Sequence, residues 1–256
     1  MHTLEKDLRA GVQALGLELA DAQIAQLLAY MDLIQKWTRV YNLTAVRDPA
    51  EMLTHHLLDS LAVIAPLQKQ LSVRVSLLQS GEAMRFAPCP SPAAQAPPLP
   101  AQNALPPGSS MVGVPVRLLD VGSGAGLPGA VIAICCPQVL VHCVDTVAKK
   151  TAFIQQVAVT LKLPNLRAIQ ARVESLTDTY DVVSSRAFAS LVDFVTWSQK
   201  ALAKQGMWMA MKGKHPADEL AALPSFAQVF HVEPLDVPGL GAERCVVWMR
   251  SPVVPA

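Results

Sequence analysis

The stretch Asp120-Val121-Gly122-Ser123-Gly124-Ala125-Gly126-Leu127-Pro128-Gly129 decides the fold. The apolar run 116–121 leads into it, and an apolar segment that we expect to be helical, from about 128 to 136, follows it. A glycine-rich turn between a strand and a helix is the setting in which such loops bind nucleotide-like ligands. Glycines there accept positive φ and let the backbone approach a ligand closely. The stretch therefore predicts a ligand-binding turn in an α/β fold.

Two classes of ligand compete for this loop. The frame Gly124-x-Gly126-x-x-Gly129 fits a dinucleotide fingerprint, with Asp145 at about the right distance to bind a ribose. The frame Asp120, then Gly122-x-Gly124-x-Gly126, is typical of the loop that binds the methyl donor S-adenosylmethionine. Asp120 would repel a pyrophosphate but can accept from the ammonium group of that donor. We favour the methyl donor, and an NAD(P)-binding oxidoreductase is the alternative.

Short apolar strands alternate with helices from residue 116 onward. Alternation of this kind predicts a parallel sheet with crossover helices, and the last two strands, which no helix joins, should be antiparallel. We expect an α/β, Rossmann-like class I methyltransferase fold with a seven-stranded mixed sheet whose last strand is antiparallel. The predicted strands are 116–121, 139–144, 166–170, 180–185, 207–211, 227–231 and 244–249, and the helices are 128–136, 149–161 and 191–203.

The chain divides into three predicted regions. Residues 1–66 form an N-terminal helical extension, with one helix capped by Asp21 and another begun by Asp48 and Pro49. The first of these helices carries Ile24, Leu27, Leu28, Met31 and Ile34 on one face. Residues 67–115 are a Pro/Ala-rich insertion, too poor in large apolar side chains to offset the entropy of ordering, and we predict disorder there. Residues 116–256 are the S-adenosylmethionine-binding domain.

Composition limits the class of partner. The 256 residues are 52% hydrophobic and carry a net charge of only +1, so any RNA contact must come from a local patch. No apolar run reaches 18 residues and the N-terminus lacks a signal-peptide core, so we expect a cytoplasmic protein with no membrane contact. The five cysteines sit mostly in apolar runs and are predicted to be reduced, and no Cys/His spacing suits a metal.

Further candidate site residues follow the ends of strands, where ligands of open α/β sheets bind. Asp145 ends the second strand and should bind the ribose hydroxyls, or else cap the next helix. Val173 and Glu174 follow the third strand and should meet the adenine. Four residues of the loop itself complete the expected donor site: Gly122, Ser123, Gly124 and Gly126.

Six segments together resemble one family, the bacterial methyltransferase G of small-subunit ribosomal RNA, formerly called glucose-inhibited division protein B. The most specific are Tyr41-Asn42-Leu43-Thr44 and Ser185-Arg186-Ala187-Phe188-Ala189. The others are Ala45 to Pro49 with His56-Leu57-Leu58-Asp59-Ser60, the glycine loop from Leu119, Arg172-Val173-Glu174, and Met211-Lys212-Gly213. Two features depart from the family: Thr54-His55, where an arginine is expected, and the 67–115 insertion.

The resemblance implies methylation of a guanine at N7 in 16S ribosomal RNA, with the RNA inside the small ribosomal subunit or an assembly intermediate. It implies donor contacts at Gly122, Leu127, Val173, Glu174 and Arg186. A ribosome-assembly module that binds RNA without catalysis is a further alternative.

The residues after the fourth strand are consistent with N7 chemistry. Guanine N7 has a lone pair and no proton, so its methylation needs positioning rather than a general base. Motifs associated with adenine amino methylation and with attack on pyrimidine carbon are absent there. Arg186 is the expected catalytic residue, either through guanine O6 or by pairing with a carboxylate. Phe188 either stacks on the base or belongs to the core.

Substrate RNA is expected to touch Lys212 and Lys214 after the fifth strand, and Arg47 and His56 in the N-terminal extension. His55 and His56 point about 100° apart on a helix, so they should not share a metal ion. We expect one of them to face inward with a hydrogen bond and the other to face outward.

Overall fold

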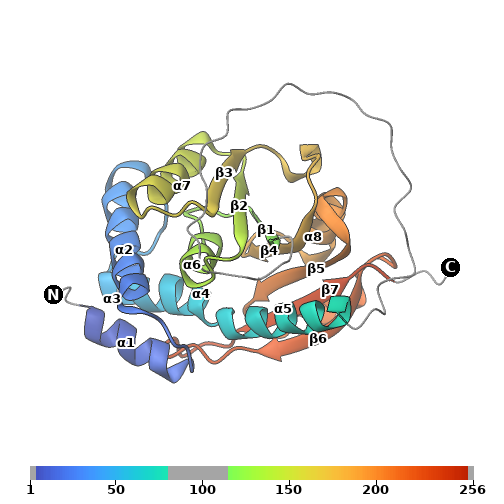
Figure 1. Ribbon diagram of the computed structural model, residues 1–256, viewed down its shortest axis with the longest axis horizontal. Helices are drawn as coiled ribbons and strands as arrows, with labels where there is room; N and C mark the ends of the chain where they lie inside the picture. The colour runs from blue at the N-terminus through green and yellow to red at the C-terminus, as the bar shows by residue number, and fades with distance from the viewer. Residues whose placement is uncertain (1–3, 80–114, 253–256) are drawn as a thin grey trace. The chain divides into compact units, whose positions relative to one another are not determined.

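A seven-stranded sheet organises the chain (Figure 1) in the computed structural model, which describes residues 4–79 and 115–252. The strand order is β3-β2-β1-β4-β5-β7-β6, with β7 antiparallel to both of its neighbours and the other pairs parallel. This confirms the predicted fold class and the antiparallel closing pair. The strands are β1 (Arg117–Val121), β2 (Leu140–Asp145), β3 (Leu166–Gln170), β4 (Tyr180–Arg186), β5 (Leu202–Lys212), β6 (Gln228–Pro234) and β7 (Cys245–Arg250).

The register brings the carboxyl ends of four strands to one edge of the sheet. Val121 pairs with Val144 on one side and with Ser185 on the other, and Asp145 pairs with Gln170. The strand order turns back between β1 and β4, which makes their shared end the topological switch point where ligands of such sheets bind.

Crossover helices connect the parallel strands. α6 (Gly129–Cys135) and α7 (Ala148–Thr160) pack against β2 and β3, while α8 (Leu191–Ser198) packs against β5 and α9 (Ala217–Ala221). The third predicted helix is shorter than expected. It passes through a 3-10 turn, Gln199–Ala201, into β5, which begins at Leu202 because that residue already pairs with Tyr180.

The N-terminal region is helical, as predicted. Its elements are α1 (Glu5–Ala14), α2 (Asp21–Tyr41), α3 (Pro49–Met52), a π-helix (Leu53–Leu58) and α4 (Asp59–Leu61). All five apolar residues predicted for the inner face of α2 are buried. Asp48 caps α3 as expected, accepting from two backbone N–H groups at 2.9 Å, but the N-cap of α2 is Ala20 rather than Asp21. The π-helix has no counterpart in the prediction.

The compact units of the chain have boundaries close to the predicted ones, near residues 66 and 115, but the two predicted regions that flank the insertion belong to one unit. Residues 4–66 and 115–252 form one compact unit, so the helical extension is not a separate domain, and the described residues 67–79 belong to a second unit. A helix, α5 (Ile64–Gln79), runs through the predicted boundary at residue 67, so the disorder predicted for residues 67–79 is wrong. The disorder predicted for the remainder of the insertion concerns residues 80–114, outside the described residues.

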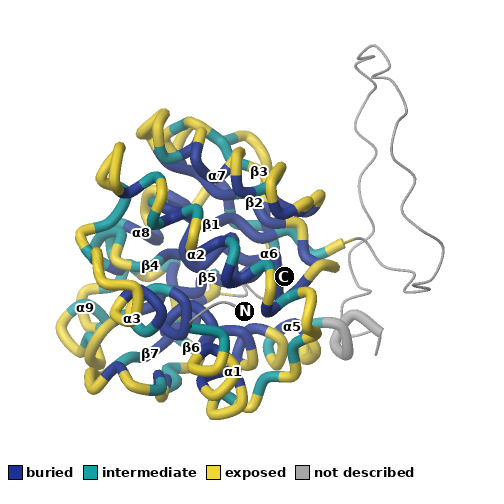
Figure 2. The backbone as a smooth tube through the Cα atoms, turned by 90° about the vertical axis from the view of Figure 1, so that its left-hand side faces the viewer, coloured by how far each residue is buried: buried dark blue, intermediate teal, exposed yellow. Residues whose placement is uncertain are grey.

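The core lies on both sides of the sheet (Figure 2), and β1, β2, β4 and α6 run through its most buried part. Trp208 and Trp248 are completely buried on β5 and β7. The four described cysteines are free and buried, as predicted, and Cys89 lies outside the described residues. No helix in the described ranges is long and apolar enough to cross a membrane.

Candidate functional site

A cavity of about 470 Å3 opens at the switch point, which is within the range of small-molecule sites. Its walls come from the ends of β1, β2 and β4 and from the segment after β3. Four of the predicted donor-binding residues line it, namely Gly122, Asp145, Val173 and Glu174. The positions of strand ends in the sequence therefore predicted part of the lining of this cavity.

The glycine loop owes its shape to backbone angles that other residues rarely adopt. Gly122, Gly124 and Gly126 have φ of +65°, +59° and +85°. The Gly122 N–H donates to the Val144 carbonyl at 2.9 Å, which ties the loop to the end of β2. A Cβ built on Gly122 would lie 2.1 Å from the Phe188 ring, so the loop and Phe188 can meet only because residue 122 has no side chain.

Asp145 connects the loop with the second strand. One carboxylate oxygen accepts from the Gly124 N–H at 3.1 Å, and the other accepts from the Val147 N–H at 2.9 Å. Lys150 lies 3.4 Å away. Asp145 thus holds the backbone just before α7, whose N-cap is Val147, and it lines the cavity. Its contact with the ribose hydroxyls stays a prediction. Oδ2 accepts from both Gly124 and Lys150, whereas Oδ1, which accepts only from Val147, keeps a lone pair for a further donor.

Asp120 lies where the prediction did not place it. It is completely buried beneath the loop and does not line the cavity. Its oxygens accept from the Gly129 N–H at 3.1 Å and from the Ser184 hydroxyl at 2.9 Å. Burial raises the pKa of Asp120 to about 7, a larger effect than that of the two hydrogen bonds, which lower it. The geometry does not provide the expected direct contact with a donor ammonium group.

The back of the loop is closed by the N-terminal helices. The Tyr30 hydroxyl of α2 donates to the Ala125 carbonyl at 2.5 Å, and Ser123, Gly126 and Leu127 are buried. These three predicted residues shape the loop from behind and do not line the cavity. The first N–H of α6 already faces the Asp120 carboxylate, which leaves no place for a pyrophosphate at that helix start.

Arg186 follows β4 and turns toward the N-terminal helices. Its Nη1 donates to Asp59 at 2.8 Å and to the His55 carbonyl at 3.0 Å. The other oxygen of Asp59 accepts from Arg244 Nε at 2.8 Å. Arg186 therefore pairs with a carboxylate, one of the two roles considered for it, and it does not line the cavity itself. Asp59 and Arg244 were not among the predicted site residues.

Phe188 lines the cavity and is partly buried. Its ring meets Trp197 edge-on, with centroids 5.8 Å apart, and Ala187 before it has φ of +49°. The indole of Trp197, which is 39% exposed, also lines the cavity and was missed in the sequence. A tryptophan in an amphipathic helix gives no sign of which pocket it will border.

The residues expected to touch RNA differ in how exposed they are and in whether they already have hydrogen-bond partners. Lys214 is exposed, whereas the Lys212 ammonium group donates to both oxygens of Glu219 and to the Ala189 carbonyl, all within 3.0 Å. Arg47 is exposed, but its guanidinium donates to Asn42 and to the Thr38 carbonyl. His56 lies 2.6 Å from the Thr44 hydroxyl.

The two adjacent histidines face different ways, as predicted. His55 is exposed, while His56 is partly buried, and burial, followed by the charge of Arg186, lowers the pKa of His56. Within the described residues no group of three histidines, cysteines or acids could hold a metal ion.

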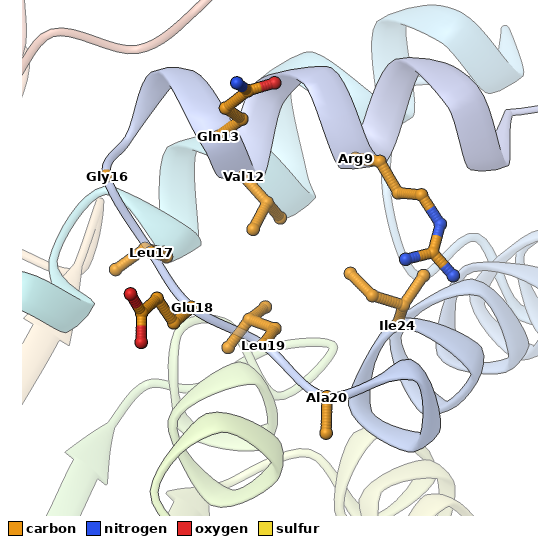
Figure 3. A pocket seen from close by; sticks show the side chains of 9 residues that line it. All are labelled: Arg9, Val12, Gln13, Gly16, Leu17, Glu18, Leu19, Ala20 and Ile24. Carbon is orange, nitrogen blue, oxygen red and sulfur yellow. The ribbon is translucent and has the colours of Figure 1, made fainter.

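A second hollow, of about 720 Å3, lies between α1 and the start of α2 (Figure 3). Val12 and Ile24 point into it, and Arg9 stands at one end, paired with Glu5 and Asp21. Gln23 at the start of α2 donates to the Ile134 carbonyl near the end of α6. The hollow is therefore at the opposite end of α6 from the glycine loop, and among the described residues no histidine, cysteine, serine or threonine lines it.

Comparison with known proteins identifies the family. The family model described as rRNA small subunit methyltransferase G matches residues 23–77 and 107–247. The chain belongs to this family. The protein is accordingly an S-adenosylmethionine-dependent methyltransferase of ribosomal RNA. The family favours the donor interpretation of the glycine loop over the dinucleotide one, and catalysis over a binding module without activity.

Individual members of the family are similar over nearly the whole chain. "Ribosomal RNA small subunit methyltransferase G" of Albidiferax ferrireducens is 59% identical, and the match covers 99% of this chain and 100% of that protein. The proteins of the same name from Polaromonas sp. and Paracidovorax citrulli are each 58% identical, over 96% of this chain and 93% and 90% of theirs. These matches span the insertion, whereas the family model leaves out residues 78–106. Among solved structures, TrmN from Thermus thermophilus is 18% identical with a TM-score of 0.46, over 54% of this chain and 44% of that one.

Proposed function

We propose that this methyltransferase modifies N7 of a guanine in 16S ribosomal RNA, within the small subunit or an assembly intermediate, in the cytoplasm. The observation that carries the proposal is the cavity at the switch point, with Gly122 and Asp145 on its walls. It combines a backbone that a ligand can approach with a carboxylate suited to hydroxyl groups.

We assign the donor the following orientation in this cavity. Asp145 accepts from the ribose hydroxyls, and the adenine lies toward Val173 and Glu174. The amino-acid end lies beside the backbone of Gly122, which borders the cavity. Asp120 supports the site from below, because it fixes the start of α6 and the end of β4. When bound, S-adenosylmethionine supplies an electrophilic methyl group.

The side chains beside the cavity suit a reaction without proton removal. Asp145, Lys150, Arg172 and Glu174 are its charged residues, and no histidine or cysteine lines it in the described chain. Guanine N7 already has a free lone pair, so the protein has to hold the base in line with the methyl group. Arg186 has N–H groups left to donate to guanine O6, while N7 remains free.

The RNA backbone meets a surface at the end of α2, which we define as Lys36, Arg39, Tyr41 and Arg47. Lys36 and Arg39 are exposed and have no ion-pair partner among the described residues, and Tyr41 is 44% exposed. Trp37 joins this surface to α7, since its ring lies 5.0 Å from Tyr41 and 5.4 Å from Phe153. Cations beside an exposed ring are typical of RNA contacts. Lys214 adds a cation after β5.

Methyl transfer to small subunits that lack the modification tests the proposal. Incubation with tritiated donor should label one guanine, located by mass mapping. Arg186→Ala should slow the labelling by at least about 10-fold while donor binding by calorimetry persists. Donor binding without any transfer to 16S RNA would contradict the proposed substrate, and a label on another atom would contradict N7.

The RNA surface has its own test. Each phosphate contact that is lost should reduce the salt dependence of RNA binding by about one unit of log–log slope. Lys36→Gln and Arg39→Gln should each show this reduction. Lys204→Gln, an exposed lysine near the start of β5, is the control and should keep the slope. Equal slopes in all three variants would remove this surface from the RNA interface.

A further inference from the structure

Asp59 is a buried carboxylate that joins three parts of the chain. It lies in α4, directly after the π-helix, and its side chain is 4% exposed. Arg186, from the end of β4, binds one of its oxygens, and Arg244, just before β7, binds the other, both at 2.8 Å. A buried charge is tolerated only when it is paired in this way. The pairing therefore fixes Asp59 and both guanidinium groups in one arrangement.

The π-helix supplies the second contact to Arg186. The Asp59 N–H bonds to the Thr54 and His56 carbonyls instead of the His55 carbonyl, which it would meet in a regular α-helix. The His55 carbonyl instead accepts from Arg186 Nη1 at 3.0 Å. Single π-helical turns are frequent at functional sites. The irregular turn thus presents a carbonyl and a carboxylate to the same nitrogen.

This double contact leaves the rest of the guanidinium group available. An arginine has five N–H donors, and Asp59 and His55 engage only Nη1. Nε and Nη2 have no hydrogen-bond partner among the residues that the structure describes. The Arg186 side chain is 19% exposed. Its orientation is therefore set from the N-terminal side, while its free N–H groups can still donate to a ligand.

We infer that Asp59 is a positioning residue for methyl transfer, acting through Arg186, and that the π-helix of the N-terminal segment is part of the active site. This inference rests on the proposed role of Arg186. Removing the charge at residue 59 lets the guanidinium group leave its fixed orientation. A misplacement of about 1 Å in a site that works by positioning can cost on the order of 100-fold in rate.

The alternative is that Asp59 only joins the N-terminal helices to the sheet. Arg244 separates the two roles, because it binds the same carboxylate but on its other oxygen. A purely structural carboxylate would make Asp59→Asn and Arg244→Gln equivalent. If Asp59 is a positioning residue, Asp59→Asn should lower turnover more than Arg244→Gln does, although both variants lower the thermal midpoint.

The decisive measurement is a double-mutant cycle on kcat with the full-length protein and unmodified small subunits. Asp59→Asn should lower kcat by about 10- to 100-fold, with the KM for the donor changed less than about threefold. Arg186→Ala should lower kcat at least as much. The double variant should be no slower than Arg186→Ala alone, because Asp59 acts only through Arg186.

Three results would overturn the inference. They are an unchanged kcat in Asp59→Asn, losses that multiply in the double variant, and a loss in Arg244→Gln as large as that in Asp59→Asn. If Asp59→Asn fails to fold, Asp59→Glu replaces it in the same double-mutant cycle. This variant keeps the negative charge but displaces Arg186 by about one methylene length. Full activity in Arg186→Ala would instead refute the role proposed for Arg186, so the two failures are distinguishable.

Discussion

At the scale of single residues, two glycines with the same φ angle allow two costs of a side chain to be measured separately. One cost is the strain of a left-handed backbone, and the other is a steric clash with a neighbour. Gly16 and Gly122 both have φ of +65°, but a Cβ on Gly16 would meet nothing within 4 Å, whereas one on Gly122 would meet Phe188. Gly16→Ala should lower the free energy of unfolding by about 1–2 kcal/mol, the cost of the left-handed backbone. Gly122→Ala should cost more and should also weaken donor binding, as measured by urea unfolding and calorimetry. Equal effects of the two changes would contradict the close packing of Phe188 on the loop.

Asp120 gives a prediction on pH. Burial raises its pKa from the ordinary value of 3.8 to about 7, so at intermediate pH the native state holds a proton there that the unfolded state has already lost. This contribution to stability is complete below about pH 4 and is lost as the pH rises to about 7. Asp120→Asn should remove this decrease in the free energy of unfolding between about pH 4 and 7.

The measurement for Asp120 is urea unfolding at several pH values, compared as the difference between parent and variant. Asp236→Asn, which changes an exposed carboxylate, is the control and should keep the parent's profile between pH 4 and 7. An identical profile in Asp120→Asn would show that Asp120 is ionised throughout.

At the scale of elements, the π-helix predicts a pH dependence of opposite sign. Burial, followed by the charge of Arg186, lowers the pKa of His56, so the unfolded chain takes up a proton before the native state does. This histidine costs stability as the pH falls below 6.5. His56→Gln should reduce the loss of stability on acidification, measured as the thermal midpoint from pH 7 to 5. His215→Gln, at an exposed histidine, should not; the same loss in His56→Gln as in the parent would contradict the buried neutral imidazole.

The sequence predicted the positions of helices and strands better than the side-chain contacts between them. Apolar runs and glycine punctuation located all seven strands, because those patterns are local. The start of β5 was missed because its first residues are half-buried or exposed and pair only through tertiary contact with Tyr180. Strand ends gave four cavity-lining residues. Spacing could not show that Asp120 turns inward, or that Arg186 meets Asp59, 127 residues away.

At the scale of the whole molecule, the site depends on two parts of the chain separated by the insertion. The helices before residue 66 cover the outer side of α6 and α7, as Figure 1 shows for α2. Gln26 of α2 donates to the Leu161 carbonyl at 2.9 Å, and Tyr30 reaches the glycine loop. The N-terminal helices therefore cover part of the core on one side of the sheet. They also close the glycine loop from behind.

Because that covering is built from non-covalent contacts, the peptide link between the two parts should be dispensable once the protein has folded. A protease site engineered between residues 85 and 105, then cut, should yield a nicked enzyme that elutes as one species and still methylates RNA. After denaturation and dilution, recovery should become bimolecular and depend on fragment concentration. Separation of the fragments under native conditions would show that the tether, and not the interface, keeps the halves together.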